Sequence, residues 1–206
     1  MAKIALIILA AGKSTRFPGN KLLKRVNGET LIEKVVSRGL ESKADAVFVV
    51  LGHESAEIEK VLGKLRTPKL YIVYNPEYEK GLSYSVKTGI RAAAEWGAEA
   101  FMILPADVAF IEARDINLVV EKYLETGSSI VVATHRGRHG HPILFSRRLL
   151  GELLEIREET YGLKSVVSSH RNEVVEVEGS EFTVRDIDTE QDLMEVLEMA
   201  KELKDA

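Results

Sequence analysis

The sequence of 206 residues contains no cysteine, and this absence removes several kinds of site at once. Without a thiol, the chain has no disulfide, no thiolate metal site and no cysteine nucleophile. It also lacks any apolar run of about 18 residues, the length that a membrane-spanning helix needs. The N-terminal apolar run, residues 4–9, leads into a glycine loop and shows no signal cleavage pattern. We therefore expect a cytoplasmic protein with no membrane partner.

Basic residues are not in excess either, because 28 Lys and Arg stand against 32 Asp and Glu, for a net charge of −4. A nucleic-acid-binding surface usually carries a basic balance, so we expect no nucleic-acid partner. Hydrophobic content of 45% and charged content of 29% are ordinary for a globular protein. With no linker, internal repeat or low-complexity segment, the length predicts a single domain over residues 1–206.

Strand-like and helix-like segments alternate along the chain. Short apolar runs predict strands, and apolar residues at helical spacing predict helices between them. The predicted strands are 4–9, 46–51, 70–74, 100–104, 129–133, 142–145, 174–177 and 183–187. The predicted helices are 31–40, 55–65, 85–96, 115–125, 147–154, 163–170 and 189–203, with Thr30 available to cap the first. This alternation predicts a single-domain, three-layer α/β/α fold with a mainly parallel, mixed sheet.

The stretch 4–25, IALIILAAGKSTRFPGNKLLKR, carries the clearest chemical signal. A buried strand runs into the small residues AAG and then into a loop with Lys13, Arg16 and Lys21, and no acidic residue precedes Glu29. Such a loop offers backbone N–H groups and positive charge to an anion, so phosphate is the expected guest. The loop matches neither the P-loop pattern nor the dinucleotide-binding pattern GxGxxG.

Other polar clusters also follow predicted strands: the loop 75–85, Asp107, and the segment 186–188. In parallel α/β sheets, ligands bind beyond the carboxyl ends of the strands. We therefore expect these clusters and the first loop to form one site.

The segment LAAGKSTRFPGNKLL strongly resembles the signature of nucleotidyltransferases with the nucleotide-diphospho-sugar transferase fold, which is GT-A/Rossmann-like. NPEYEKGLSYSVKTGI, LPADVAF, HGHPILF and DIDTEQDL follow in the expected order, so the resemblance covers nearly the whole chain. Within this group the chain is most similar to the MobA-like molybdenum cofactor (molybdopterin) cytidylyltransferases. The resemblance implies an enzyme that moves a nucleoside monophosphate from a nucleoside triphosphate to a phosphorylated acceptor and releases pyrophosphate.

The resemblance implies two catalytic cations and two metal ligands. Arg16 would bind the β- and γ-phosphates through its planar fork, and Lys21 would face the α-phosphate and its developing charge. Asp107 and Asp188 would hold Mg²⁺, which favours one or two carboxylates together with phosphate oxygens and water. The alternatives are a solvated basic loop for the two cations and helix capping for the two aspartates.

The resemblance also implies the residues that frame the nucleotide. Gly81 allows close backbone approach, and Ser83 or Ser85 can offer a hydroxyl to a pyrimidine edge, although Ser83 can instead cap a helix. Ala11, in LAAG, would narrow the base slot and so favours CTP over GTP. The predicted nucleotide-binding residues are Leu9, Ala10, Ala11, Gly12, Lys13, Asn75, Gly81, Ser83 and Ser85.

The acceptor side is expected at RGRHGHPILF, where the predicted acceptor-binding residues are His139, Gly140 and His141. A histidine that only shapes the pocket is the alternative for His141. Lys164, in YGLKS, would join this pocket on resemblance alone. Ala109 is a departure, because relatives usually have proline at that position, and it puts the turn after Asp107 in doubt.

Three alternatives remain open at this point. The chain could be a guanylyltransferase for molybdopterin or a transferase for another phosphorylated acceptor. It could also be a nucleotide-binding regulatory protein that has lost catalysis, for which the departure at Ala109 is the only support. The apolar spacing of the closing helix 189–203 favours burial against the sheet, with an oligomer contact as the alternative.

Overall fold

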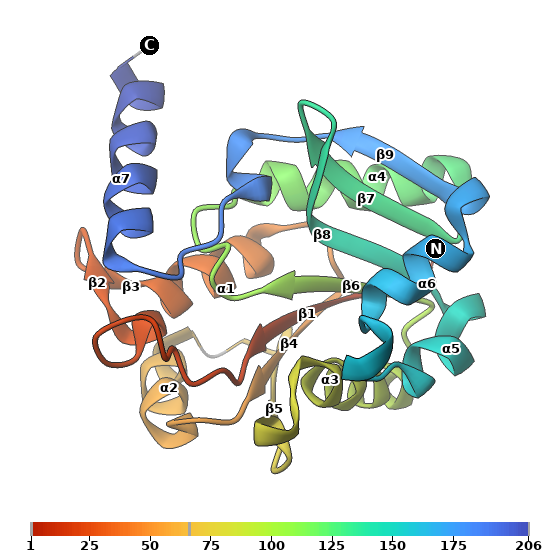
Figure 1. Cartoon of the computed structure of the whole chain (residues 1–206), viewed down its shortest axis with the longest axis horizontal. Helices are drawn as coiled ribbons and strands as arrows, with labels where there is room; N and C mark the ends of the chain where they lie inside the picture. Colours follow the sequence, from red (N-terminus) through yellow and green to blue (C-terminus); the bar gives the residue numbers. More distant parts are fainter. Residues whose placement is uncertain (1, 66, 206) are drawn as a thin grey trace.

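A computed structural model describes residues 2–65 and 67–205. Its centre is a seven-stranded sheet in the order β5-β4-β1-β6-β8-β7-β9 (Figure 1). The strands are β1 Ile4–Ala10, β4 Ala46–Leu51, β5 Leu70–Tyr74, β6 Ala100–Pro105, β7 Ile130–His135, β8 Arg138–Ser146 and β9 Val174–Glu178. Among these described strands, only β8 runs antiparallel to its neighbours. The predicted mainly parallel, mixed sheet is therefore confirmed.

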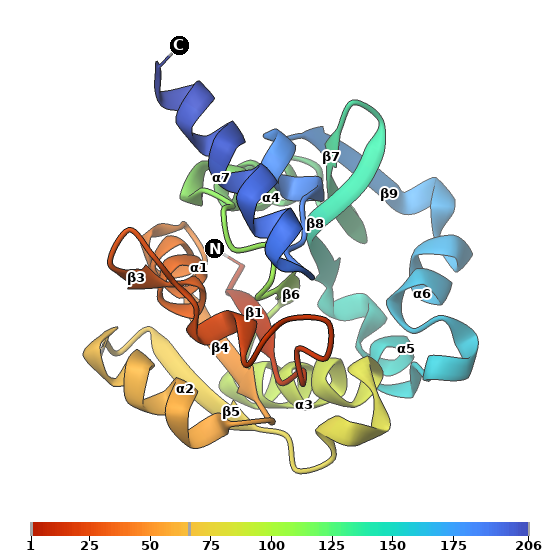
Figure 2. The same ribbon diagram turned by 60° about the vertical axis from the view of Figure 1, so that its left-hand side comes forward.

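Helices cover both faces of this sheet, and the turned view in Figure 2 shows the layers. The helices are α1 Leu31–Glu41, α2 Ser55–Leu62, α3 Leu82–Trp96, α4 Ala113–Thr126, α5 Leu150–Glu155, α6 Leu163–Ser169 and α7 Glu190–Asp205. One apolar cluster joins α1, α2 and α4 to one face, and a second joins α3, α5 and α6 to the other. A separate hairpin, β2 Arg25–Val26 and β3 Glu29–Thr30, precedes α1.

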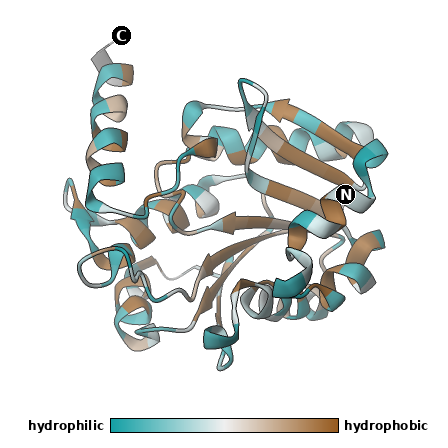
Figure 3. Cartoon of the chain, viewed as in Figure 1, coloured by the Kyte–Doolittle hydropathy of each residue, from teal (hydrophilic) through white to brown (hydrophobic). Residues whose placement is uncertain are grey.

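The central strand β1 shows why this sequence forms a sheet with two covered faces. Successive residues of a strand point to opposite faces; Leu6 and Ile8 pack in one cluster, whereas Ala5 and Ile7 pack in the other. All seven residues of β1 are buried. A strand buried on both sides needs a continuous apolar run, which Figure 3 shows as brown ribbon through the centre of the fold.

Helix α1 begins where the sequence predicts, because Thr30 caps it. The Thr30 hydroxyl oxygen accepts from the backbone N–H of Glu33 at 3.2 Å, and the Glu33 carboxylate accepts from the backbone N–H of Thr30 at 2.9 Å. This reciprocal capping box satisfies two donors that would otherwise lack partners in the first turn.

The predicted strand 183–187 is wrong. A 3-10 helix, η7 Glu181–Val184, occupies the start of this stretch. The hydroxyl and the backbone N–H of Thr183 both donate to the Ser180 carbonyl, at 2.7 and 3.1 Å, and hold this turn. Phe182 is buried in an apolar cluster with Phe110. The apolar side chains are therefore buried by a turn that lies over the sheet, not by strand pairing.

The predicted burial of the closing helix against the sheet is also wrong. Leu193 and Val196 of α7 are buried in a cluster with Phe17, Leu31 and Phe110, outside the two clusters that cover the sheet. The far end of the helix projects from the body, as Figures 1 and 2 both show.

Within the described part of the chain, no helix combines the length and apolar character needed to cross a membrane.

Candidate active site

A cavity of about 650 Å³ lies beyond the carboxyl ends of β1 and β6. The structure brings most of the predicted site residues to its wall, although they are spread over the sequence from the first strand to the start of α7. These residues are Leu9, Ala10, Ala11, Gly12, Arg16, Lys21, Gly81, Ser85, Asp107, His139, Gly140, His141 and Asp188. The expectation of one site built by several loops therefore agrees with the geometry.

Two cations and two carboxylates meet in this cavity. Lys21 Nζ lies 2.9 Å from Asp107 Oδ2 and 3.0 Å from Asp188 Oδ1. The guanidinium of Arg16 lies 2.8 Å from the other oxygen of Asp188. The Lys21 side chain is only 11% exposed, whereas that of Arg16 is 70% exposed. Lys21 is therefore enclosed at the centre of the cluster, whereas Arg16 pairs with Asp188 at its solvent-exposed edge.

Local structure fixes Lys21 in this position. It begins the 3-10 helix Lys21–Leu23 (η1), and the Asn20 side chain caps that helix by accepting from the Leu22 N–H at 3.0 Å. Leu22 is buried, so the turn is anchored in the core. The charged side chain therefore extends from a short segment with little freedom.

The two aspartates are joined through the backbone. The N–H of Ile187 donates to the carbonyl of Asp107 at 3.0 Å, which places the segment around Asp188 beside the loop after β6. Neither carboxylate caps the helix that follows it. At α4, the side chain of Asp115 accepts from the backbone N–H of Glu112, and at α7, Thr189 and Asp192 cap the helix. The capping alternative for Asp107 and Asp188 is thus not supported.

The departure at Ala109 does not displace Asp107. Ala109 is fully buried in the cluster with Phe17 and Phe110. The turn after β6 is closed by the Val108 N–H, which donates to the Pro105 carbonyl at 3.2 Å. An alanine fills this position in the core, and the carboxylate still faces Lys21.

The donor set around Lys21 fits Mg²⁺. Two carboxylate oxygens from distant segments approach the same point, where one cationic nitrogen lies within 3.0 Å of both. Mg²⁺ is typically bound by one or two carboxylates, with phosphates and water completing the shell. Within the described residues, no group of three or more His, Asp or Glu could hold a metal by itself. A metal held here would therefore need oxygen ligands from a substrate.

Three predicted nucleotide-binding residues do not line the cavity. Lys13 forms an ion pair with Glu79, on the outside of the loop. Ser83 is buried inside α3, which begins at Leu82, so it is not the helix cap. Asn75 is buried behind the wall, where its side-chain N–H donates to Ser85 Oγ at 2.9 Å.

Asn75 therefore orients a neighbour that does line the cavity. Because Ser85 Oγ accepts from Asn75, its own hydrogen is available to donate to a group in the cavity. Ala11 lies on the same wall, and a methyl group added at Gly52 would come within 2.9 Å of the Ala11 methyl. The wall around Ala11 is thus closely packed.

On the opposite side, β8 supplies His139, Gly140 and His141. His139 Nε2 lies 2.6 Å from Glu176 Oε1. His141 Nδ1 is buried without a hydrogen-bond partner among the described residues. Burial lowers the pKa of His141 below its usual range, and the carboxylate of Asp107 nearby acts in the opposite direction. His141 therefore lies in the wall of the cavity, with its Nδ1 buried behind the surface that the cavity presents.

Gly140 lets the backbone of β8 approach the backbone of η7 closely. A Cβ at this position would lie 2.2 Å from the Thr183 carbonyl oxygen, so the close approach is to η7. Thr183 and Val184 consequently line the cavity beside Lys164. The sequence did not predict Thr183 and Val184 as cavity residues, because a strand was predicted there. It did not predict Tyr78 and Leu82 either, because nothing in the sequence distinguishes them from other loop residues.

With this geometry in view, comparison with known proteins identifies the class: the chain is a nucleotidyltransferase. It belongs to the family of MobA-like NTP transferase domains, whose sequence model matches residues 6–174. The predicted family is therefore confirmed.

Two curated relatives show the range of similarity. The purine catabolism protein PucB of Bacillus subtilis (strain 168) is 32% identical over 144 residues, which are 68% of this chain and 69% of PucB. The molybdenum cofactor cytidylyltransferase of Escherichia coli (strain K12) is 24% identical over 203 residues, which are 98% of this chain and 100% of that protein. The chain spans only 29% of a matching bifunctional protein GlmU from Synechococcus sp. (strain RCC307).

Solved structures confirm the fold. The Rv0371c homologue from Mycobacterium sp. strain JC1 has a TM-score of 0.79 at 24% identity and covers 98% of both chains. Rv0371c of Mycobacterium tuberculosis, in complex with manganese, has a TM-score of 0.71 at 20% identity and covers 96% of this chain and 99% of its own.

Proposed function

We propose that this nucleotidyltransferase transfers CMP from CTP to a phosphorylated acceptor, molybdopterin, with Mg²⁺ as cofactor and release of pyrophosphate. The observation that carries the proposal is the convergence of Lys21, Asp107 and Asp188 within 3.0 Å, with Arg16 beside them. Phosphoryl transfer needs mainly positioning and charge neutralisation. Two cations and two carboxylates supply both.

The cations neutralise the triphosphate. Lys21 can exchange its carboxylate partners for oxygens of the α-phosphate, where negative charge develops as pyrophosphate leaves. Arg16, exposed at the mouth of the cavity, reaches the β- and γ-phosphates and can bind two oxygens at once. The backbone N–H groups of the small-residue loop add donors to the same anion.

Asp107 and Asp188 would hold the metal. When bound there, Mg²⁺ would offset charge on the α-phosphate and the leaving pyrophosphate. The similarity to the manganese complex of Rv0371c supports a divalent metal in this fold. The remaining coordination would come from the triphosphate and water, because Mg²⁺ typically takes one or two carboxylates and completes its shell with phosphate and water oxygens.

The base and acceptor residues support CTP and a phosphate ester. Ser85 can donate to a carbonyl of a pyrimidine, and the Ala11 methyl on the cavity wall would narrow the base slot in favour of a pyrimidine. On the other side of the cavity, His141 would contact the acceptor, while Lys164 would neutralise its phosphate. The full-length similarity to the E. coli molybdenum cofactor cytidylyltransferase supports molybdopterin as that acceptor.

A panel of nucleoside triphosphates with Mg²⁺, followed by thermal unfolding, tests the base. Binding to the folded state raises the melting temperature by mass action, so CTP should give the largest rise. A larger rise with GTP would contradict the pyrimidine assignment and favour a guanylyltransferase. If no nucleotide raised the melting temperature, the proposed nucleotide site itself would be wrong.

The second candidate acceptor is a phosphate ester other than molybdopterin. It is favoured by the 32% identity to PucB, whose name places it in purine catabolism. Direct assays of pyrophosphate release from CTP distinguish molybdopterin from such an ester. Molybdopterin should stimulate release, whereas other phosphate esters of similar size should not. Stimulation by another ester alone would overturn the acceptor and leave the nucleotidyl transfer intact.

A further inference from the structure

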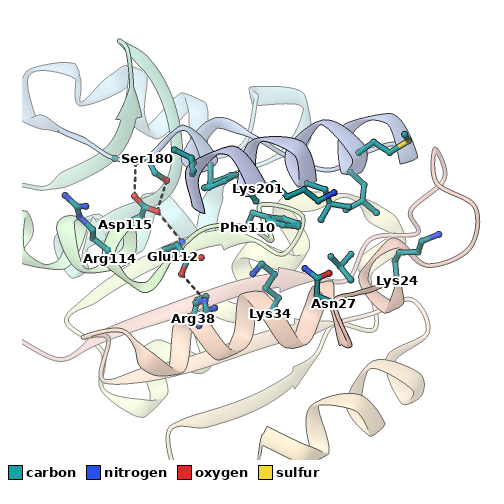
Figure 4. A pocket seen from close by; sticks show the side chains of 18 of the residues that line it. Lys24, Asn27, Lys34, Arg38, Phe110, Glu112, Arg114, Asp115, Ser180 and Lys201 are labelled. Carbon is teal, nitrogen blue, oxygen red and sulfur yellow. Dashed lines mark hydrogen bonds and ion pairs between the residues drawn. The ribbon is translucent and has the colours of Figure 1, made fainter. Parts of the chain in front are cut away.

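A second, larger groove of about 1080 Å³ lies outside the candidate active site, between α7, α1 and the β2–β3 hairpin. Figure 4 shows Phe110 between Lys34 of α1 and Lys201 of α7. Lys34 Nζ lies 4.9 Å from the centre of the Phe110 ring, and neither lysine has an ion-pair partner among the described residues. The groove therefore combines an apolar floor with cations that no carboxylate neutralises.

Helix α7 leaves apolar surface uncovered along this groove. Met194 is 58% exposed and Leu203 is 63% exposed, and both line the groove. The first turns of α7 are buried through Leu193 and Val196, whereas residues 201–203 are all exposed. Nine positions separate Met194 from Leu203, which places them on opposite sides of the helix, so α7 exposes apolar surface on more than one side.

The groove-facing side of α7 has an arrangement of charge that complements itself. Glu190, Met194, Leu197 and Lys201 all line the groove. They follow one another at i, i+4, i+7 and i+11, a spacing that places side chains on one face of a helix. Glu190 and Lys201 lie equally far from the midpoint between Met194 and Leu197. An acidic end, an apolar centre and a basic end therefore follow one another along this face.

We propose that this groove is an interface between two copies of the chain, in which α7 of one copy packs antiparallel against α7 of the other. In a twofold-symmetric dimer, both copies use the same surface patch. If one residue of the first copy contacts a second residue of its partner, the reverse contact forms as well. About that axis, Glu190 of each copy faces Lys201 of the partner subunit, and Met194 faces Leu197 of the partner subunit. The midpoint symmetry of the four residues allows both pairs to form at once.

The charges of α7 from residue 190 to residue 203 agree with a second α7 as the occupant. Between residues 190 and 203, α7 has five acidic residues and one lysine: Glu190, Asp192, Glu195, Glu198, Glu202 and Lys201. The groove wall that receives the partner helix includes Arg25 and Lys34. Lys24, Arg38 and Arg114 also line the wall opposite α7, against Glu112, Asp115 and Glu178, so its balance is basic and complements an acidic helix. The internal pair of Glu190 with Lys24, at 3.3 Å and about half exposed, leaves the carboxylate accessible to the partner.

A charge swap followed by sedimentation velocity of the full chain tests the interface. The wild-type chain should sediment as a dimer. Lys201→Glu should weaken the dimer at least tenfold, because two carboxylates then face each other in both symmetric pairs. Glu190→Lys should also weaken the dimer, because two ammonium groups then face each other in both pairs. The double variant with both substitutions should restore it, because each pair regains opposite charges in reversed order.

Lys60→Glu is the matched control, since it makes the same change at an exposed lysine of α2 that does not line the groove. It should leave the dimer unchanged. A wild-type chain that remains monomeric at the highest soluble concentration would overturn the proposal. So would a dimer that Lys201→Glu leaves intact, or a double variant that stays monomeric while its circular dichroism spectrum matches that of the wild type.

Discussion

The ammonium group of Lys21 lies 3.0 Å from the carboxylate of Asp188, although 167 residues separate the two in sequence. The first loop and the start of α7 are thus joined by a charge pair inside the candidate active site. Because the side chain of Lys21 is 11% exposed, the pair is shielded from water more than a surface pair would be. We expect function to depend on both residues.

Lys21→Ala should reduce the rate of pyrophosphate release by about 10²–10³-fold, the usual loss when one group that stabilises transition-state charge is removed. Steady-state assays with CTP and acceptor would measure it, and the loss should appear in kcat. Lys24→Ala is the control, because Lys24 lies three residues away, lines the other groove and pairs with Glu190. Unchanged turnover in Lys21→Ala would show that its catalytic assignment is wrong.

Asp188→Asn should weaken the binding of Mg²⁺ in the presence of CTP by about 100-fold. Loss of partners that only support metal ligands costs about 10–100-fold, so loss of a ligand itself should cost at least as much. Titration of Mg²⁺ followed by thermal unfolding would measure the change. Asp186→Asn is a sensitive comparison, because Asp186 also lines the cavity but does not contact Lys21. Equal effects of the two variants would contradict the assignment of Asp188 as the metal ligand.

The fold was predictable from the sequence where a segment is buried on both sides. The strand β4 is buried throughout and begins and ends at the predicted residues, because a continuous apolar run leaves few alternatives. The predicted strand 183–187 failed for the opposite reason. Its apolar residues are buried by a turn that packs over β8, and that contact joins residues more than 40 positions apart.

Candidate site residues were predicted where their position along the chain and the family resemblance agreed. Lys21 follows a small-residue loop, and the resemblance pairs it with Asp107 and Asp188; the structure brings these side chains together, although the strand predicted before Asp188 is absent. Asn75 was predicted to bind the nucleotide directly, but it does not line the cavity and instead holds Ser85 from behind. The interface proposed for α7 was also beyond sequence patterning, since the pattern predicts an apolar face but not what covers it.

Gly140→Ala should destabilise the protein by about 1–3 kcal/mol, the cost of overpacking a closed interior site. The added methyl would lie 2.2 Å from the Thr183 carbonyl, which is backbone and cannot rotate away. Urea unfolding would measure the difference. Gly151→Ala is the matched control, because no atom lies within 4 Å of its added methyl on α5. That variant should be stabilised by about 0.4–1 kcal/mol. Equal stability of the two variants would contradict the close contact at Gly140.

His170 should make the stability of the protein depend on pH. Its ring bonds Glu173 at 2.9 Å and Glu152 at 3.0 Å, and these two carboxylates raise its pKa above the usual range. The folded state therefore holds the proton more tightly than the unfolded chain does. The resulting stabilisation is fully present below the unfolded pKa of about 6.5 and is lost as the pH rises through the higher folded pKa.

The melting temperature of His170→Gln should accordingly fall below that of the wild type by more at about pH 5.5 than at about pH 9, where the wild-type ring is neutral. Differential scanning fluorimetry at both pH values would measure this. In a background with Glu152→Gln and Glu173→Gln, the same substitution should have an effect that no longer varies with pH, because the carboxylates that raise the pKa are gone. If the difference in melting temperature between the wild type and His170→Gln instead grew with pH, the folded state would stabilise the neutral ring, which would contradict the raised pKa of His170.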